Sequence, residues 1–508
     1  MMPMIRNFFF AFFVLILPLL AEWDEASFAN PPADVSRPVA CLAVDGGRES
    51  DAHRAATLLD RAKNAGAGGV LVSLPAATAS VWTNWSALAT QAARYGFDIA
   101  FRDFSLPNSP APGGKEVSSG IFARHVNQLL YQSQRNLRNV YGTSLVGYHF
   151  DRVPVGMCSI VNDLVQEAGL RASGAVFRLP LPPEEAAVYF HRQALETSTL
   201  HPVPYPFDED SDLSEDILRK AAIRSMFNRR AAGGAHTFWR EQIWGILRLS
   251  ATPADVPGGV HLPFGWKPYA DELLTAGATR VVLDYEGGLP SDDRRFRELR
   301  EGCKYLQRCS HFLRQGDPVA DFLFWPGALE SGAWPEEHSF DTADRAMLAH
   351  ALLERGRVTF ASERSYEQIV VAPDVTNQAA SVQLIAKCRR AGIAVSFWPS
   401  CPKPDVRWYA DATGRVYPLR FCHRRERVQG RKPMAQAMDL YFLANPAPYG
   451  FDVNLTLRDA KHRPPILADP IKGEFSRPQD YTFLRDGSLQ IRLPMDAYES
   501  RFILFGVP

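Results

Sequence analysis

Carboxylates and histidines stand at the ends of several apolar, strand-like segments in this sequence. The clearest segment is GATRVVLDYEGG, residues 277–288, in which a β-branched run passes abruptly into Asp284. Two other runs end in the same way, FDIAFRDF with Asp103 and SLVGYHFDR with His149 and Asp151. Two carboxyl groups that converge on one cleft can act as acid and base, or as acid and nucleophile, in the hydrolysis of a glycosidic bond.

A further segment, GGAHTFWRE, adds an imidazole, an indole ring and another carboxylate that suit a sugar-binding cleft. Asp284 and Glu286 alternate sides along a strand, so at most one of them faces inward, and Glu286 next to two glycines is expected at the rim. The predicted catalytic residues are Asp151, Asp284 and Glu241. The predicted substrate-binding residues are Asp103, His149, His236, Trp239 and Glu286.

Each of these residues also has an ordinary structural interpretation. Asp103 or Asp151, directly after a strand, can cap the following helix, and His236 can be a buried, hydrogen-bonded histidine. The tryptophans at 239, 244 and 266 can stack on a sugar ring or pack in the core. The basic run at 423–425 lies in a β-rich region, where an ion-pair network is the simpler interpretation.

Strand-like and helical segments alternate from residue 38 onward. Apolar, β-branched runs typical of strands occur at 39–44, 68–74, 97–104, 144–152, 244–250 and 279–286. Amphipathic runs typical of helices occur at 51–66, 82–96, 118–137, 266–277 and 293–315. This alternation predicts a parallel α/β sheet, and its closed form at this length is a (β/α)8-like barrel, whose active site lies at the carboxyl ends of the strands.

The pattern changes after residue 316. Strands at 318–327, 366–373 and 393–399, with helices over 339–356 and 378–392, predict a small α/β domain. It has no glycine-rich phosphate loop, which argues against nucleotide binding. Short strands separated by turns follow from about residue 404 and predict a β-sandwich. The predicted division is a signal peptide at 1–29, a barrel-like domain at 38–316, an α/β domain at 317–403 and a β-sandwich at 404–508.

The first residues predict export. Arg6 is followed by thirteen apolar residues, 8–20, which are too few for a comfortable membrane span and typical of a signal peptide. Small side chains at Ser27 and Ala29 favour a cut after Ala29, and Ala21 is an earlier alternative. We therefore expect a periplasmic or secreted protein with no stable membrane span after cleavage, with an uncleaved anchor as the alternative.

The amino-acid composition indicates which classes of binding partner and metal ion are expected. Lysine plus arginine and aspartate plus glutamate number 56 each, and this balance argues against a nucleic-acid partner. Seven cysteines without a Cys-x-x-Cys pattern favour neither a disulfide scaffold nor a zinc site. The acidic loop PFDEDSD, residues 206–212, offers oxygen ligands that suit calcium, and a solvated loop is the simpler interpretation.

The last two hundred residues resemble glycoside hydrolase family 106, the α-L-rhamnosidases, in the order and spacing of several segments. These are DPVADFLFWPG, HSFDTADRAML, SYEQIVVAP, HRRERVQGRKPMAQAMDLYFLANP, LADPIKGE and DGSLQIRLPMDAYESRFILFG. KPYADELLTAGATRVVLDY is similar to the end of the family's barrel. The first two hundred residues match only as an alternation of strands and helices.

The resemblance implies an oligo- or polysaccharide partner and calcium-dependent, inverting hydrolysis of an α-L-rhamnoside or a related deoxysugar linkage. Two positions depart from the family pattern. Asp284 stands where the last barrel strand commonly ends in histidine, and His236 stands where an earlier strand commonly carries glutamate. These departures leave open a hydrolase, a catalytically degenerate carbohydrate-binding relative serving an exopolysaccharide system, and a transferase on the same scaffold.

Overall fold

The structure is a computed structural model. It describes most residues before position 150 and most residues after position 243. It describes residues 25–31, 37–42, 49–73, 79–102, 131–140, 145–149, 244–249, 264–275, 277–285, 293–325, 337–343, 345–360, 365–409, 417–425 and 438–506. Among these residues, no helix combines the length and the apolar character that crossing a bilayer requires.

Six strands form one parallel sheet in the order β4-β3-β2-β1-β6-β5. From β1 to β6 they span Val39–Leu42, Gly69–Ser73, Asp98–Arg102, Leu145–His149, Trp244–Leu249 and Arg280–Tyr285. β1 pairs with both β2 and β6, so the first and last of these strands are neighbours, as they are in a closed α/β barrel. The parallel α/β sheet is confirmed. The complete barrel stays a prediction, because residues 150–243, between β4 and β5, lie outside the described segments.

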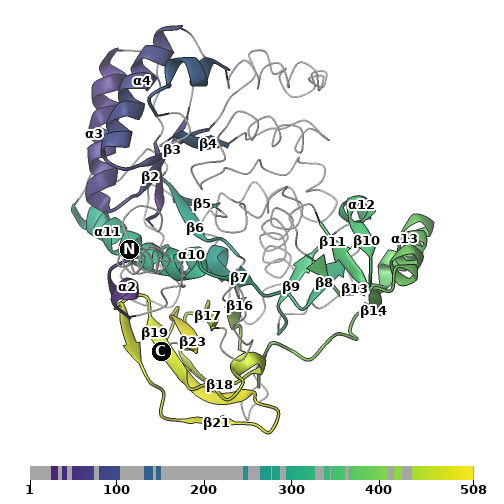
Figure 1. Ribbon diagram of the computed structural model, residues 1–508. Coiled ribbons are helices and arrows are strands. Elements are labelled where there is room, and N and C mark those ends of the chain that lie inside the picture. Colours follow the sequence, from purple (N-terminus) through teal and green to yellow (C-terminus); the bar gives the residue numbers. More distant parts are fainter. Residues whose placement is uncertain are drawn as a thin grey trace, which may run out of the picture.

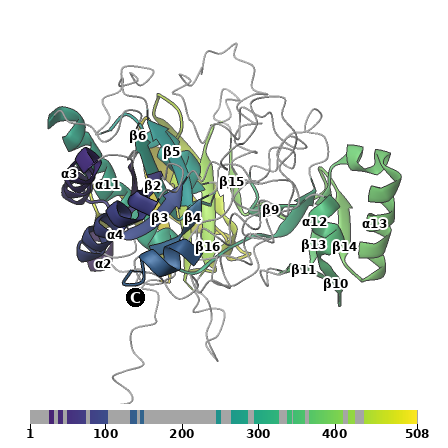
Figure 2. The same cartoon turned by 90° about the horizontal axis from the view of Figure 1, so that it is seen from above.

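Three long helices lie along one side of this sheet: α3 (Glu49–Ala65), α4 (Ala79–Arg94) and α11 (Asp293–Leu313) (Figures 1 and 2). Helix α3 shows how the sequence specifies this layer, because Leu59, Ala62 and Ala65 recur at intervals of three and are all buried. The helix ends where Gly66 adopts a φ of +91°, a left-handed conformation that glycine reaches without steric cost.

Helix α10 (Lys267–Thr275) is buried along its whole length. It contacts β5 and β6 of the parallel sheet and also β16 (Arg420–Arg425) and β17 (Asp439–Ala444) of the carboxyl-terminal region. Its buried charges are paired, since Lys267 Nζ lies 2.6 Å from Asp271 Oδ2 and Glu272 Oε1 lies 3.2 Å from Arg420 Nη1. The Lys267 ammonium also donates to Ser500 Oγ at 2.8 Å. This helix therefore joins the parallel sheet to the carboxyl-terminal sheets through paired charges and the hydrogen bonds of Lys267.

A second, smaller parallel sheet follows in the order β14-β13-β8-β9. Its strands and principal helix are β8 (Phe322–Trp325), β9 (Phe340–Thr342), β13 (Gln368–Val371), β14 (Ala394–Phe397) and α13 (Ala379–Arg390). These elements stand to one side of the rest of the structure in both views (Figures 1 and 2).

The predicted helix over 339–356 forms only in part. That segment contains β9, the short helix α12 (Arg345–His350) and the strand β10 (Leu352–Glu354), which forms an antiparallel hairpin with β11 (Arg357–Thr359). Arg355 and Gly356 have φ values of 51° and 74°, the two positive values that a type I′ turn requires. The alanine- and leucine-rich composition favoured a helix, and the tight Arg-Gly turn overrides that propensity.

Two antiparallel sheets form the carboxyl-terminal region, in the orders β15-β18-β22-β21 and β20-β19-β23-β17-β16-β7. Their strands are β7 (Asp317–Pro318), β15 (Val406–Trp408), β16 (Arg420–Arg425), β17 (Asp439–Ala444), β18 (Phe451–Leu457), β19 (Pro465–Asp469), β20 (Glu474–Ser476), β21 (Tyr481–Phe483), β22 (Leu489–Met495) and β23 (Ser500–Phe505). Side chains from both sheets, such as Leu455, Ile491, Tyr441 and Ile503, share one buried core. Buried and exposed residues alternate strictly along β22, as expected for a sandwich strand with one face in water.

Candidate functional site

Two of the eight predicted site residues lie on described strands, and both are at the carboxyl-terminal edge of the parallel sheet. His149 is the last residue of β4, and Asp284 is the last but one of β6. The other six lie outside the described residues: Asp103, Asp151, His236, Trp239, Glu241 and Glu286. Because the strands are parallel, their carboxyl ends meet at one edge of the sheet, where α/β enzymes place their active sites.

A buried ion pair at the opposite edge identifies the concave face of this sheet. Arg280 Nη1 donates to Asp98 Oδ2 at 2.5 Å, and Arg280 Nε donates to the carbonyl of Arg37 at 2.8 Å. Their strands, β6 and β3, are three strand intervals apart, about 14 Å on a flat sheet. The side chains meet because the sheet curves toward the face that carries them. A Cβ atom on Gly69 would lie 3.3 Å from Arg280 Nη2, so glycine leaves room for the guanidinium.

Strand register extends this face assignment consistently. Residues aligned in neighbouring parallel strands share a face, and residues two apart on one strand also do. Val282, two residues after Arg280, is aligned with Val39 of β1, which is aligned with Gly69 of β2. Gly69 is in turn aligned with Asp98 of β3. Arg280 and Asp98 therefore lie on the same face of the sheet, the concave face, which we call the interior face.

The same strand register and two-residue alternation assign positions 149 and 284 to this interior face. Position 284 lies four residues after Arg280 on β6 and is aligned with position 248 of β5. Position 149 is aligned with position 102, which lies four residues after Asp98 on β3. The backbone thus brings two predicted site positions on β4 and β6 to one face and one edge, although they are 135 positions apart in the chain, the difference between 284 and 149.

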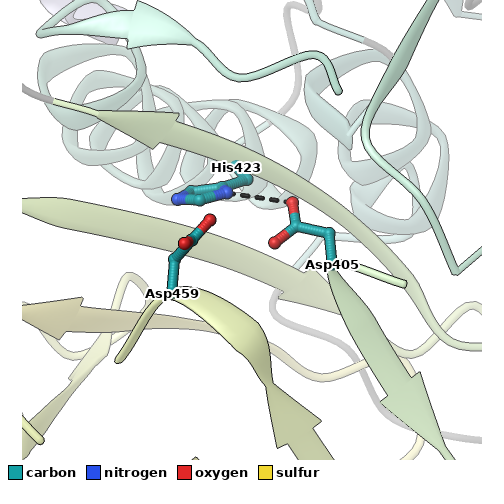
Figure 3. A group of neighbouring side chains, drawn as sticks. All are labelled: Asp405, His423 and Asp459. Carbon is teal, nitrogen blue, oxygen red and sulfur yellow. Dashed lines mark hydrogen bonds and ion pairs between the residues drawn. The ribbon is translucent and has the colours of Figure 1, made fainter. Parts of the chain in front are cut away.

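A second polar cluster lies in the carboxyl-terminal region, around His423 of β16. His423 Nδ1 lies 2.9 Å from Asp405 Oδ2, and Nε2 lies 3.0 Å from Asp439 Oδ1. None of these three side chains is exposed to solvent. Figure 3 shows Asp405 and Asp459 turned toward the imidazole from neighbouring segments. With a carboxylate at each ring nitrogen, the imidazole donates two hydrogen bonds and is positively charged.

Arginines complete the cluster. Arg425 lies 2.6 Å from Asp439 and 2.9 Å from Asp459, and Arg463 lies 2.5 Å from Asp439. Arg458 pairs with Asp321 at 2.7 Å. The cluster thus contains four acids and four cations, which are Asp321, Asp405, Asp439, Asp459, His423, Arg425, Arg458 and Arg463. Its charges balance, and the ion-pair interpretation is confirmed for His423 and Arg425. Arg424, between them, donates instead to the carbonyls of Gln315 and Gly316.

The electrostatics of the cluster follow from this pairing. Burial acts to lower the pKa of His423, but the charges and hydrogen bonds of Asp405 and Asp439 outweigh burial and raise the pKa to about 9. Burial acts to raise the pKa of Asp405, and the charge and hydrogen bond of His423 outweigh it and hold that pKa well below its usual range. The imidazole is therefore a fixed cation at neutral pH, unsuited to exchanging a proton with a substrate.

Asp405, His423 and Asp459 are also spaced closely enough to surround a metal ion. Their donor atoms do not fit one, because every carboxylate already accepts hydrogen bonds and the nearest charges are cationic. The groups that donate to, or pair with, these two carboxylates are Ser339, Tyr441, His423, Arg425 and Arg458. This cluster is not a calcium site. The acidic loop at 206–212, the sequence candidate for calcium, lies outside the described residues.

Cys401 and His338 form a contact that includes a potential nucleophile, the Cys401 thiol. Cys401 Sγ lies 3.1 Å from His338 Nε2. Burial, followed by the charge of Glu337, raises the pKa of the Cys401 thiol. An activated cysteine needs the opposite shift, because the thiolate is the nucleophile. The geometry therefore gives a structural contact and no nucleophilic site.

Trp266 belongs to the core and not to a sugar-binding surface. Its side chain is 8% exposed and its ring lies 4.4 Å from that of Phe264. It also covers Gly302 of α11 so closely that a Cβ atom there would lie 2.1 Å from the indole. The core interpretation of this tryptophan is confirmed.

Comparisons with known proteins give a distant likeness of fold. No protein-family model matches the sequence, and no curated protein matches it. The rhamnosidase from Novosphingobium sp. PP1Y is 15% identical with a TM-score of 0.47, and the match covers 75% of this chain and 40% of that one. The alpha-L-fucosidase isoenzyme 2 from Paenibacillus thiaminolyticus is 10% identical with a TM-score of 0.47, and the match covers 92% and 99%.

A GH30 endoxylanase from Clostridium papyrosolvens C71 is 9% identical with a TM-score of 0.32, and the match covers 93% of this chain and 97% of that one. The chain spans only 40% of the length of the Novosphingobium rhamnosidase. These matches are distant structural similarities, and no family is assigned by sequence.

Sequence reasoning missed most of the buried cluster. Asp405, Asp439 and Asp459 lie in different strands or turns, and none interrupts an apolar run conspicuously. The available signal was the basic run at 423–425 inside a strand, which requires buried acids somewhere nearby. Which acids those are depends on the pairing of the strands.

Proposed function

We propose that this chain is an exported glycoside hydrolase-like protein that binds an oligo- or polysaccharide at the carboxyl-terminal edge of its parallel sheet. The observation that carries the proposal is the placement of positions 149 and 284 on the interior face and at that edge. Polar residues at this edge are positioned for catalysis or binding, whereas those at the opposite edge serve stability. The buried Arg280–Asp98 pair occupies the opposite edge.

The proposed chemistry uses two carboxyl groups. Asp284, at the carboxyl end of β6, acts as base or nucleophile. Asp151 or Glu241 supplies the acid that protonates the leaving oxygen. A separation of roughly 6.5–9.5 Å between the two carboxyl groups would give inversion, and roughly 5–5.5 Å would give retention.

Rhamnose, or a related deoxysugar, is the proposed substrate on the strength of the resembling carboxyl-terminal segments. A non-catalytic, carbohydrate-binding role is the second candidate. The observation that favours it is Asp284 itself, which replaces the histidine that the resembling family commonly carries at the end of its last barrel strand. Calcium remains an expectation from the resemblance, because the acidic loop at 206–212 that could hold it lies outside the described residues.

The test replaces Asp284 and Asp151 separately by Asn and measures hydrolysis of aryl α-rhamnosides and of rhamnose-containing oligosaccharides, with and without a calcium chelator. Asp452→Asn is the matched control, because Asp452 is an exposed carboxylate on β18 that pairs with a surface arginine, Arg492. We expect a loss of at least about 100-fold in kcat for each site variant and no change for the control.

Each result decides between the two candidates. Full activity in both site variants would show that these residues are not the catalytic pair. If the wild-type protein binds the oligosaccharides without hydrolysing them, and the Asp284→Asn variant binds them more weakly, the binding function is supported and the enzymatic function is refuted.

A further inference from the structure

The short helix α2 (Glu25–Ala29) packs against the folded body of the protein through one buried side chain, that of Phe28. Phe28 is fully buried. Its ring stacks on Phe312 of α11 with centroids 4.5 Å apart, and it also lies 5.6 Å from Phe475 and 5.9 Å from Phe502. The helix therefore contacts both α11 and the sandwich strand β20, between which it lies in Figure 1.

Polar contacts hold the same segment at both ends. The Glu25 carboxylate accepts a hydrogen bond from the backbone N–H of Phe475 at 3.2 Å. Arg308 Nε donates to the carbonyl of Ala29 at 3.4 Å, and Gln307 Nε2 donates to the carbonyl of Pro31 at 2.9 Å. We call residues 25–31 the N-terminal clasp, because they connect α11 to the antiparallel sheets.

Arg308 shows that the clasp is integrated with the sandwich. Its guanidinium also donates to the carbonyl of Ile471 at 2.6 Å. A Cβ atom on Gly473 would lie 2.7 Å from the same guanidinium, so the turn after β19 is shaped around this arginine. One side chain of α11 thus binds the clasp and the sandwich together.

The clasp conflicts with a leader cut after Ala29, which the small residues Ser27 and Ala29 favour. That cut would remove Phe28 and Glu25 and would leave the aromatic cluster without its central ring. Interiors are close-packed, and deleting a buried aromatic side chain leaves a cavity that neighbours fill only in part. We propose that the N-terminal clasp is retained in the mature protein, so that any leader cut falls upstream of Glu25, with the bond after Ala21 as the available site.

The first test determines the N-terminus of the exported protein by mass spectrometry of the intact chain. An N-terminus between Glu22 and Glu25 supports the proposal, and an N-terminus at Asn30 overturns it. This measurement is independent of whether the protein hydrolyses or binds a glycan.

The second test compares urea unfolding of chains that begin at Glu22 and at Asn30. We expect the unfolding equilibrium constant of the shorter chain to be at least about 100-fold larger, as for the loss of any buried phenylalanine. Phe28→Ala in the longer chain should reproduce most of this effect. Phe28→Leu should have a smaller effect on unfolding, and it serves as the test if the shorter chain does not fold. Leu484→Ala, at a 36% exposed leucine, is the control. Equal midpoints for the two chains, or no effect of either Phe28 variant, overturn the proposal.

Discussion

Replacing His423 by Gln should remove a specific pH dependence from the stability of this protein. The amide N–H of glutamine can still donate to one of Asp405 and Asp439, but its carbonyl oxygen cannot donate to the other, and the side chain carries no charge at any pH. The wild-type imidazole lies between these two buried carboxylates at 2.9 and 3.0 Å and stacks on Tyr441 with ring centroids 4.0 Å apart. The substitution therefore removes the charge at the centre of the cluster and keeps most of the volume.

The sign and size of the effect follow from the shift in the pKa of His423. In the folded protein the pKa is raised from 6.5 to about 9. A raised pKa gives stability that is fully present below about pH 6.5 and is lost as the pH rises through about 9. A shift of this size corresponds to a contribution on the order of 3 kcal/mol. The variant should lack that contribution, so its stability should fall less steeply across this window.

The assay is urea unfolding followed by tryptophan fluorescence at several pH values from 6 to 9.5. Thiols and other groups that titrate in this window are present in both proteins, so the difference between wild type and variant isolates His423. His462→Gln, which replaces an exposed histidine in the same region, should keep the wild-type slope. Parallel pH profiles for wild type and His423→Gln would refute the assignment of a charged imidazole.

Two further substitutions test the packing that positions the parallel sheet. Gly302→Ala should reduce the free energy of unfolding by about 1–3 kcal/mol, because the added methyl group would overpack against Trp266. In most helix interiors alanine is instead more stabilising than glycine. A variant that is more stable than wild type in urea unfolding would therefore contradict the contact. Arg280→Met should cost on the order of 3 kcal/mol, because it leaves the Asp98 carboxylate without its buried partner. Adding Asp98→Leu should restore part of that loss, and equal denaturation midpoints for wild type and Arg280→Met would show that the pair contributes nothing.

The locations of most described strands and helices could be predicted from local sequence alone. The strands β1, β2, β3 and β6 were expected to within a few residues, because β-branched runs and the glycines after helices are local signals. The parallel direction followed from the alternation of strands with helices. The edge position of His149 and Asp284 followed as well, since parallel strands bring their carboxyl ends together.

Tertiary structure decided what those local signals could not contain. Arg280 and Asp98 meet across three strand intervals, and Phe28 fills a cluster with aromatic rings more than 280 positions away on the chain, as the difference between 28 and 312 gives. His423 acquires its charge only because strand pairing brings Asp405 and Asp439 to its two nitrogens. Sequence periodicity determines which residues of one element face inward. The partner that each buried charge or ring finds depends on how remote elements pack, because burial makes an unpartnered charge or an unfilled space costly.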